Sequence, residues 1–104
     1  MRIAGFDWDH GNWPKCGKHG VSQTEIEDVL SSQPGIYPDP AHSHAEQRFL
    51  AIGRTGAGRH LLIAFTLRHQ SGRSLIRPVS ARFMHAKEVQ HNEQSQKDPG
   101  PDNR

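Results

Sequence analysis

Arginine dominates the second half of this sequence and determines the chemistry that it can perform. Between residues 48 and 82 there are seven arginines and neither a lysine nor an acidic residue. They are Arg48, Arg54, Arg59, Arg68, Arg73, Arg77 and Arg82. A guanidinium stays charged at physiological pH and donates paired hydrogen bonds to phosphate or carboxylate oxygens. A surface that only needs charge would mix in lysine and glutamate, so the segment predicts an anionic partner, of which nucleic acid is the commonest kind.

The acidic residues lie mostly on the N-terminal side of these arginines. Residues 1–47 carry seven acidic and three basic side chains, although the formal net charge of the whole chain is +2. About two or three arginines are expected to form ion pairs across the fold. The candidate partners are Glu25, Glu27, Asp28 and Glu46. Helix acids that also face water cannot neutralise all seven arginines, so free guanidinium groups should remain for a ligand.

A helix over residues 22–32 is the clearest local prediction. Ser22 and Glu25 have the spacing of a capping box, in which each side chain bonds the other residue's backbone amide. Val21 and Ile26 occupy the positions of a hydrophobic staple across this helix start. Acidic residues in the first turn also match the positive end of the helix dipole.

The remaining elements are mostly strands. A short strand is expected over residues 3–8, a loop or one broken helical turn over 9–20, and a loop over 33–40. Further strands are expected over 46–53, 59–68 and 74–82, with turns at 53–58 and 69–72 and a closing helix over 83–90. Pro78 cannot donate to a sheet, so its strand should lie at an edge or carry a bulge. The order predicts a two-layer α+β domain with an N-terminal strand and helix, a three-stranded antiparallel meander and a C-terminal helix.

One folded domain is expected over residues 1–90, since 104 residues is a typical single-domain size. No apolar side chain follows Val89, and we expect residues 91–104 to form a disordered polar tail. A single cysteine, Cys16, allows no intrachain disulfide and favours a reducing compartment. With no signal-peptide pattern and no apolar run of membrane-spanning length, the chain is expected to be cytoplasmic.

The eight histidines raise the question of a metal site. His42 and His44 follow Asp39, and Cys16 precedes His19, but neither group has the paired ligand spacing of a structural zinc site. Both groups lie in proline- or glycine-rich segments, and we interpret them as solvent-exposed loop residues. Neither a metal nor a cofactor is expected.

Four stretches together resemble the BrnT family of type II toxins, a branch of the RelE-like ribonuclease fold. The resemblance runs from Phe6 to about Val89. The first two stretches are residues 6–9 (FDWD) and residues 18–22 (KHGVS). The third consists of Asp39, His42, Ser43, Glu46 and Arg48, followed by residues 52–55 (IGRT) and 58–59 (GR). The fourth consists of residues 65–68 (FTLR), 76–82 (IRPVSAR) and 87–88 (KE). The chain departs from the family between Asp9 and Lys18, where Gly11, Pro14 and Gly17 replace an alanine-rich helical stretch.

The resemblance implies a metal-independent endoribonuclease that inhibits translation, with RNA as its substrate and no membrane partner. It also implies a ribbon-helix-helix antitoxin of the BrnA type, which blocks the site and represses the shared operon, so that DNA is contacted only through the antitoxin. RelE-like toxins are typically monomers, and a monomer is expected here.

Cleaving RNA without a metal requires cations on the phosphate, a base for the 2′-hydroxyl and an acid for the leaving oxygen. We expect Arg68, Arg77 and Arg82 on the phosphate. Their common face depends on the strand register set by the turn around Gly72, because a slip of one residue would turn Arg77 to the other side. The other four arginines, Arg48, Arg54, Arg59 and Arg73, are expected to bind RNA more widely.

The candidates for the base are His19, Glu46 and His85, with Lys18 as a stabilising group or acid. Each base candidate also has a purely structural interpretation. His19 can pack at the start of the helix, Glu46 can pair with Arg48 or Arg59, and His85 can be an exposed residue of the last helix.

Two other functions fit the charge pattern. One is a non-catalytic basic module that binds nucleic acid or an acidic partner, and the other is a degenerate toxin kept for antitoxin binding and operon repression. An enzyme requires a proton-transfer group within reach of the arginine cluster, and a binding module does not.

Overall fold

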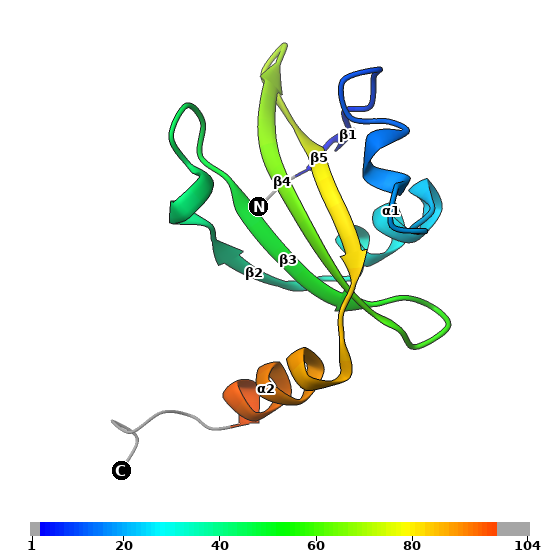
Figure 1. Ribbon diagram of the computed structural model, residues 1–104. Helices are drawn as coiled ribbons and strands as arrows, with labels where there is room; N and C mark the ends of the chain where they lie inside the picture. The colour runs from blue at the N-terminus through cyan, green and yellow to red at the C-terminus, as the bar shows by residue number, and fades with distance from the viewer. Residues whose placement is uncertain (1–2, 98–104) are drawn as a thin grey trace.

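The computed structural model describes residues 3–97, with side chains described up to residue 92. Its centre is a five-stranded mixed sheet of order β1-β5-β4-β3-β2, with helix α1 beside it and helix α2 beyond one end (Figure 1). The strands are β1 (Gly5–Phe6), β2 (Gly35–Pro38), β3 (Phe49–Arg54), β4 (His60–Gln70) and β5 (Arg73–Phe83). The helices are α1 (Gln23–Ser31) and α2 (Ala86–Lys97), with 3₁₀ turns η1 (Lys15–Gly17) and η2 (Pro40–His42). The fold is therefore α+β, as the sequence predicts.

Helix α1 begins where the capping box places it. The Glu25 amide donates to the Ser22 hydroxyl at 3.0 Å, and the Ser22 amide donates to the Glu25 carboxylate at 2.9 Å. Val21 and Ile26, the predicted staple pair, are both buried. With Val29, they place the apolar face of α1 against the sheet. The helix prediction is confirmed.

The core lies between α1 and one face of the central strands. Leu61, Ile63 and Phe65 alternate along β4 and are fully buried there. Phe65 stacks on Phe49 of β3, with ring centroids 5.5 Å apart. Because side chains alternate along a strand, the intervening residues of β4 belong to the opposite sheet face, which we call the open face.

The register between β4 and β5 decides which arginines reach the open face. Ser71 and Gly72 both have positive φ angles, 51° and 75°, as a two-residue hairpin turn requires. This turn sets Gln70 opposite Arg73 and, further along, Thr66 opposite Arg77. Arg68 lies two residues from Thr66, and Arg82 pairs with Leu62, so Arg68, Arg77 and Arg82 all belong to the open face.

Pro78 lies at a β-bulge, which confirms one of the two predicted alternatives. Ala64 pairs with Ser80 and Phe65 with Pro78, which leaves Val79 as the extra residue. Strand β5 is not at an edge, since β1 pairs with it in parallel. That pairing ends at Ile76, however. No residue of β1 therefore pairs with Pro78, and its lack of an amide donor interrupts no hydrogen bond to β1.

The structure corrects the sequence interpretation at several elements. The strand expected over residues 46–53 begins only at Phe49, which leaves Glu46 in the preceding loop. Residues 35–38 form edge strand β2, where a loop was predicted, because Ile36 and Tyr37 pair with Ala51 and Leu50 while Pro38 ends the strand. Phe83 does not begin the closing helix but pairs with Leu61 as the last residue of β5.

Helix α2 begins at Ala86 and continues to Lys97, through part of the segment expected to be a tail. Residues rich in Glu, Gln and Lys have good helix propensity even without an apolar face. The predicted tail residues 98–104 lie outside the described residues. None of the described helices is long and apolar enough to cross a membrane.

Gly53 on β3 provides a test of how closely α1 packs on the sheet. A Cβ atom there would lie 2.8 Å from Val29 Cγ1 and 3.2 Å from Pro34 Cβ. We expect Gly53→Ala to lower the free energy of unfolding by about 1–3 kcal/mol, because overpacking forces the helix and strand apart. Gly56→Ala is the matched control, since a Cβ there meets nothing within 4 Å. Urea denaturation measures both, and equal stabilities would contradict the close packing.

Candidate active site

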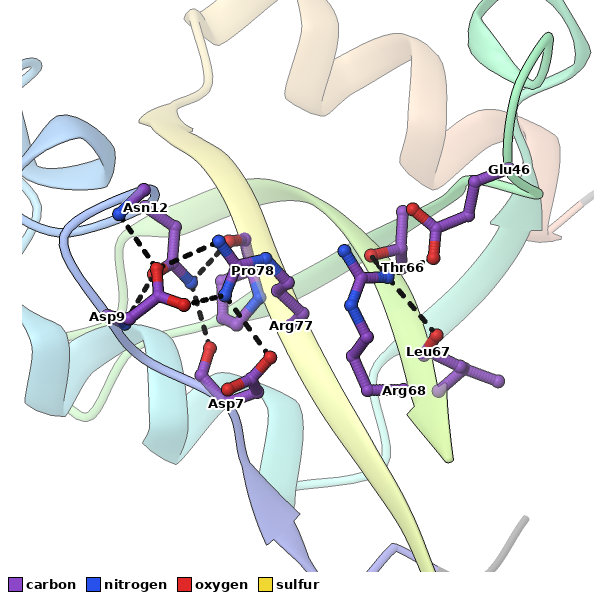
Figure 2. A network of polar contacts seen from close by, with 10 residues as sticks. Asp7, Asp9, Asn12, Glu46, Thr66, Leu67, Arg68, Arg77 and Pro78 are labelled. Carbon is purple, nitrogen blue, oxygen red and sulfur yellow. Dashed lines mark hydrogen bonds and ion pairs between the residues drawn. The ribbon is translucent and has the colours of Figure 1, made fainter. Parts of the chain in front are cut away.

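Arg77 of β5 is held by two carboxylates from the N-terminal segment. Its Nη1 donates to Asp7 at 3.2 Å and to Asp9 at 3.1 Å, and its Nη2 donates to Asp9 at 2.9 Å (Figure 2). The hydrogen bond from Arg77, with a further one from the Gly11 amide, lowers the pKa of Asp9. The hydrogen bonds to Asp9 first, and to Asp7 second, raise the pKa of Arg77. The guanidinium is therefore fixed in direction, with only 15% of its side chain exposed.

Asn12 fastens this N-terminal segment to the bulge in β5. Its amide donates to the carbonyls of Asp7 and Pro78, both at 2.9 Å, and its carbonyl accepts from the Asp9 amide at 2.8 Å. The residue is buried, so these bonds satisfy polar atoms that water does not reach. Asn12 thus positions the two acids beside Arg77 (Figure 2).

Arg68 on β4 is paired with Glu46, which comes from the loop between β2 and β3. Arg68 Nη1 donates to Glu46 Oε2 and also lies 3.2 Å from the Thr66 hydroxyl (Figure 2). The pair is partly open to solvent, with 36% of the Arg68 side chain and 42% of the Glu46 side chain exposed. Glu46 therefore pairs with Arg68, one of the arginines predicted to bind the phosphate, rather than with Arg48 or Arg59.

These groups border one pocket of about 460 Å³ beside the open face, which we call the arginine pocket. Three of its lining residues are the arginines Arg48, Arg68 and Arg77. The others are Gly11, Asn12, His42, His44, Ala45, Glu46, Thr66, Pro78 and Val79. A second pocket shares His42 and Arg48 with it and adds two predicted site residues, His19 and Arg82. The two pockets adjoin at His42 and Arg48.

The loop of residues 39–48 is closed by its own hydrogen bonds. The Asp39 amide donates to the Arg48 carbonyl at 3.0 Å, and Ser43 Oγ bridges the Asp39 carbonyl and the Arg48 amide at 2.7 and 2.9 Å. The Asp39 carboxylate lies 3.1 Å from His42 Nδ1 and 3.5 Å from Arg48 Nε. One carboxylate therefore holds both an imidazole and a guanidinium at the junction of the two pockets.

Arg82 is bound to the start of α2. Its two terminal nitrogens donate to Glu88 at 2.8 and 2.7 Å, and the His85 amide donates to the same carboxylate at 2.9 Å. The bonds from Arg82 first, and from the His85 amide second, lower the pKa of Glu88 to about 2. Glu88 thus caps α2 and joins it to the sheet.

The structure brings together some of the predicted site residues and separates others. Arg48, Glu46, Arg68 and Arg77 share the arginine pocket, and His19 and Arg82 line the second pocket. Lys18 and His85 are exposed and line neither. Three arginines also lie outside both: Arg59 stacks over Phe83 at 3.5 Å, while Arg54 and Arg73 are exposed at opposite ends of the sheet.

The ion-pair partners differ from those expected, except for Glu46. The arginines pair with Asp7, Asp9, Asp39, Glu46 and Glu88. Glu27 instead accepts a hydrogen bond from the Trp8 indole, and none of the arginine pairs in the described part of the chain involves an acid of α1. Asp7 and Asp9 reach Arg77 across about 70 residues of sequence, so no local pattern indicates the pairing.

Asp39 and His42 are the notable omission from the predicted site. In the sequence they belong to the group that carries the family resemblance and to a rejected metal site, but they are not among the predicted catalytic residues. The signal that identifies them is their three-residue spacing, which the 3₁₀ turn η2 converts into direct contact. Among residues 3–92, no group of three or more His, Cys, Asp or Glu side chains is placed to hold a metal ion.

The arrangement suits an anionic ligand with a transferable proton. The guanidinium groups of the arginine pocket can accept phosphate oxygens, and a carboxylate and an imidazole stand beside them as proton acceptors. The model for the family described as ribonuclease toxin, BrnT, of type II toxin–antitoxin systems matches residues 8–88. A search of curated proteins found no match.

The Arg82–Glu88 pair predicts a pH-dependent stability. The pKa of Glu88 is lowered to about 2 in the folded protein from an ordinary 4.5, so the pair stabilises fully above pH 4.5 and its effect disappears as the pH falls to 2. Wild type should be more stable than Glu88→Gln at pH 7, and the two should converge toward pH 2. Urea denaturation across this range measures the difference.

Arg82→Gln is the matched control, because it removes the other partner. Adding Glu88→Gln to this variant should change stability much less than adding it to wild type. A difference that stays constant from pH 7 to pH 2 would contradict the ion pair.

Proposed function

This protein belongs to the BrnT family of ribonuclease toxins of type II toxin–antitoxin systems, since the family match spans residues 8–88 of 104, and on that premise we propose that it is a metal-independent endoribonuclease that inhibits translation. The observation that carries the proposal is the meeting of Arg48, Arg68 and Arg77 with a proton acceptor, Glu46, in one pocket. A basic module that only bound RNA would need the arginines but would not need a proton acceptor beside them.

The proposed reaction uses the guanidinium groups where a metal-dependent nuclease would use a metal ion. Arginines stabilise the charge that develops on the phosphorane oxygens as the 2′-oxygen attacks. Arg68 and Arg77 lie on neighbouring strands, and their donors are already aligned by carboxylates. A phosphate entering the pocket would replace Glu46 on Arg68 and release this carboxylate beside the scissile bond.

We assign separate parts to the other predicted residues. Glu46 and His19 line the pockets and support a role in proton transfer, whereas Lys18 and His85 would act only on more distant parts of the RNA. Arg82 would bind a neighbouring phosphate in the second pocket. Arg54, Arg59 and Arg73, at the ends of the sheet, would contribute only to long-range attraction of RNA.

The proposed partners follow from the toxin–antitoxin family. An antitoxin of the ribbon-helix-helix, BrnA-like type would cover the arginine pocket and bring the toxin to operator DNA, which the toxin itself would not contact. An RNA substrate and an antitoxin made beside the toxin would both support a cytoplasmic location.

Inducible expression in bacteria tests the function directly. Wild type should arrest growth, reduce incorporation of labelled methionine and degrade RNA, while Arg68→Gln should be harmless, with RNA cleavage about 10²-fold slower in vitro because a phosphate ligand is lost. Lys87→Gln is the matched control, since it removes one positive charge from an exposed position on α2 outside both pockets. Intact RNA and normal growth with wild type would reduce the pocket to a binding surface.

Metal independence is tested with the purified chain. Cleavage of a ribo-oligonucleotide should continue at an unchanged rate in excess EDTA, because arginines supply the charge stabilisation. Activity that disappears with EDTA and returns with Mg²⁺ would refute this part of the proposal.

A further inference from the structure

His42 occupies the junction of the two pockets. Both pockets include His42 and Arg48 among their lining residues, so a strand of RNA that occupied both pockets would pass the imidazole. The His42 side chain is 62% exposed, while its Asp39 partner is only 11% exposed. The ring is therefore accessible to a ligand, and the group that holds it is not.

Asp39 fixes the orientation of this ring. Its two carboxylate oxygens each lie 3.1 Å from His42 Nδ1. A carboxylate accepts hydrogen bonds, so Nδ1 carries the proton and Nε2 is left as an acceptor in the neutral imidazole. Because the ring nitrogens lie on different sides of the imidazole, Asp39 directs Nε2 away from itself.

The backbone around Asp39 is itself held in place. The Asp39 amide, the Ser43 hydroxyl and the Arg48 carbonyl form the closed set of hydrogen bonds that joins the ends of β2 and β3. Arg48 Nε, 3.5 Å from the carboxylate, adds a positive charge on the other side of Asp39. The carboxylate is thus positioned before any ligand binds.

We propose that His42 is a catalytic residue that takes the proton of the attacking 2′-hydroxyl, and that Asp39 is its positioning residue. This inference rests on the proposed ribonuclease function and assigns the base to a residue outside the predicted candidates, which were His19, Glu46 and His85. Glu46 is committed to Arg68 in the free protein. The Nε2 atom of His42, in contrast, has no bonded partner among the described residues and is open to the substrate.

The step balances without any further reagent. The O2′–H proton moves to His42 Nε2, the O2′–P bond forms and the P–O5′ bond breaks, which leaves a 2′,3′-cyclic phosphate. The departing O5′ takes a proton from water to give a 5′-hydroxyl. The imidazolium, stabilised by Asp39, then returns its proton to the hydroxide.

The test is the cleavage of a ribo-oligonucleotide by purified full-length variants. His42→Ala should lower kcat by about 10²–10⁴-fold, the range of general acid–base catalysis, while binding a 2′-O-methyl version of the oligonucleotide within about twofold of wild type. His91→Ala is the matched control, an exposed histidine of α2 outside both pockets, and should cleave like wild type. Urea midpoints of the variants show that each is folded, and His42→Gln serves if the alanine variant is not.

Two further measurements separate a base from a merely structural residue. Added imidazole should partly restore His42→Ala but not Asp39→Asn, which keeps its own imidazole in a looser orientation. A substrate with a nitrophenol leaving group should leave the defect of His42→Ala intact, because such a substrate needs no general acid but still needs a base. Disappearance of the defect with this substrate would overturn the assignment.

The outcomes distinguish the two proposals. Cleavage by His42→Ala at the rate of wild type overturns the role of His42 and leaves the ribonuclease function standing. An inactive wild type, tested with Arg68→Gln beside it, overturns both.

Discussion

The pairing of β4 with β5 is the constraint on which the site depends. A β-strand alternates its side chains between faces, so a shift of one residue would turn Arg77 from the open face toward the core and move Ile76 out of it. Two local features set the register. The Ser71–Gly72 turn aligns the strands at one end, and the bulge at Val79 then shifts the alternation between Arg77 and Arg82. Because Arg77 and Arg82 are five residues apart, a regular strand would place them on opposite faces, and the bulge brings both to the same one.

The site arginines are already occupied by carboxylates in the free protein. Asp7 and Asp9 hold Arg77, Glu46 holds Arg68, and Glu88 holds Arg82. The Arg68–Glu46 and Arg82–Glu88 pairs are partly open to solvent, and such pairs contribute little to stability, so a phosphate could replace the carboxylate in them at small cost. Arg77 is more enclosed, with 15% of its side chain exposed, and its two carboxylates fix the direction of its guanidinium. Glu88 adds a connection, because its release from Arg82 would also loosen the cap of α2.

The sequence predicts what depends on neighbouring residues. The capping box of Ser22 and Glu25 located α1, and the missing amide of Pro78 indicated the bulge. Contacts between distant residues could not be predicted in this way: Asp7 meets Arg77 only because β1 pairs in parallel with β5. The same limit explains why Phe83 was assigned to a helix, since its spacing from Ala86 and Val89 fits a helix while its partner, Leu61, lies across the sheet. The set of arginines was therefore predictable, whereas their acidic partners, apart from Glu46, were not.

The strand that the sequence did not predict explains how a loop can hold a reactive group. Strand β2 pairs Pro38 with Phe49, and the next contact beyond it is the bond from the Asp39 amide to the Arg48 carbonyl. The ladder of β2 and β3 thus leads directly into the closed loop that carries His42. A short edge strand contributes little burial of its own, and Ile36 remains partly exposed. Its contribution is positional, because it joins the loop that carries His42 to the sheet. The His42 side chain thereby lines the same pocket as Arg68 of β4 and Arg77 of β5.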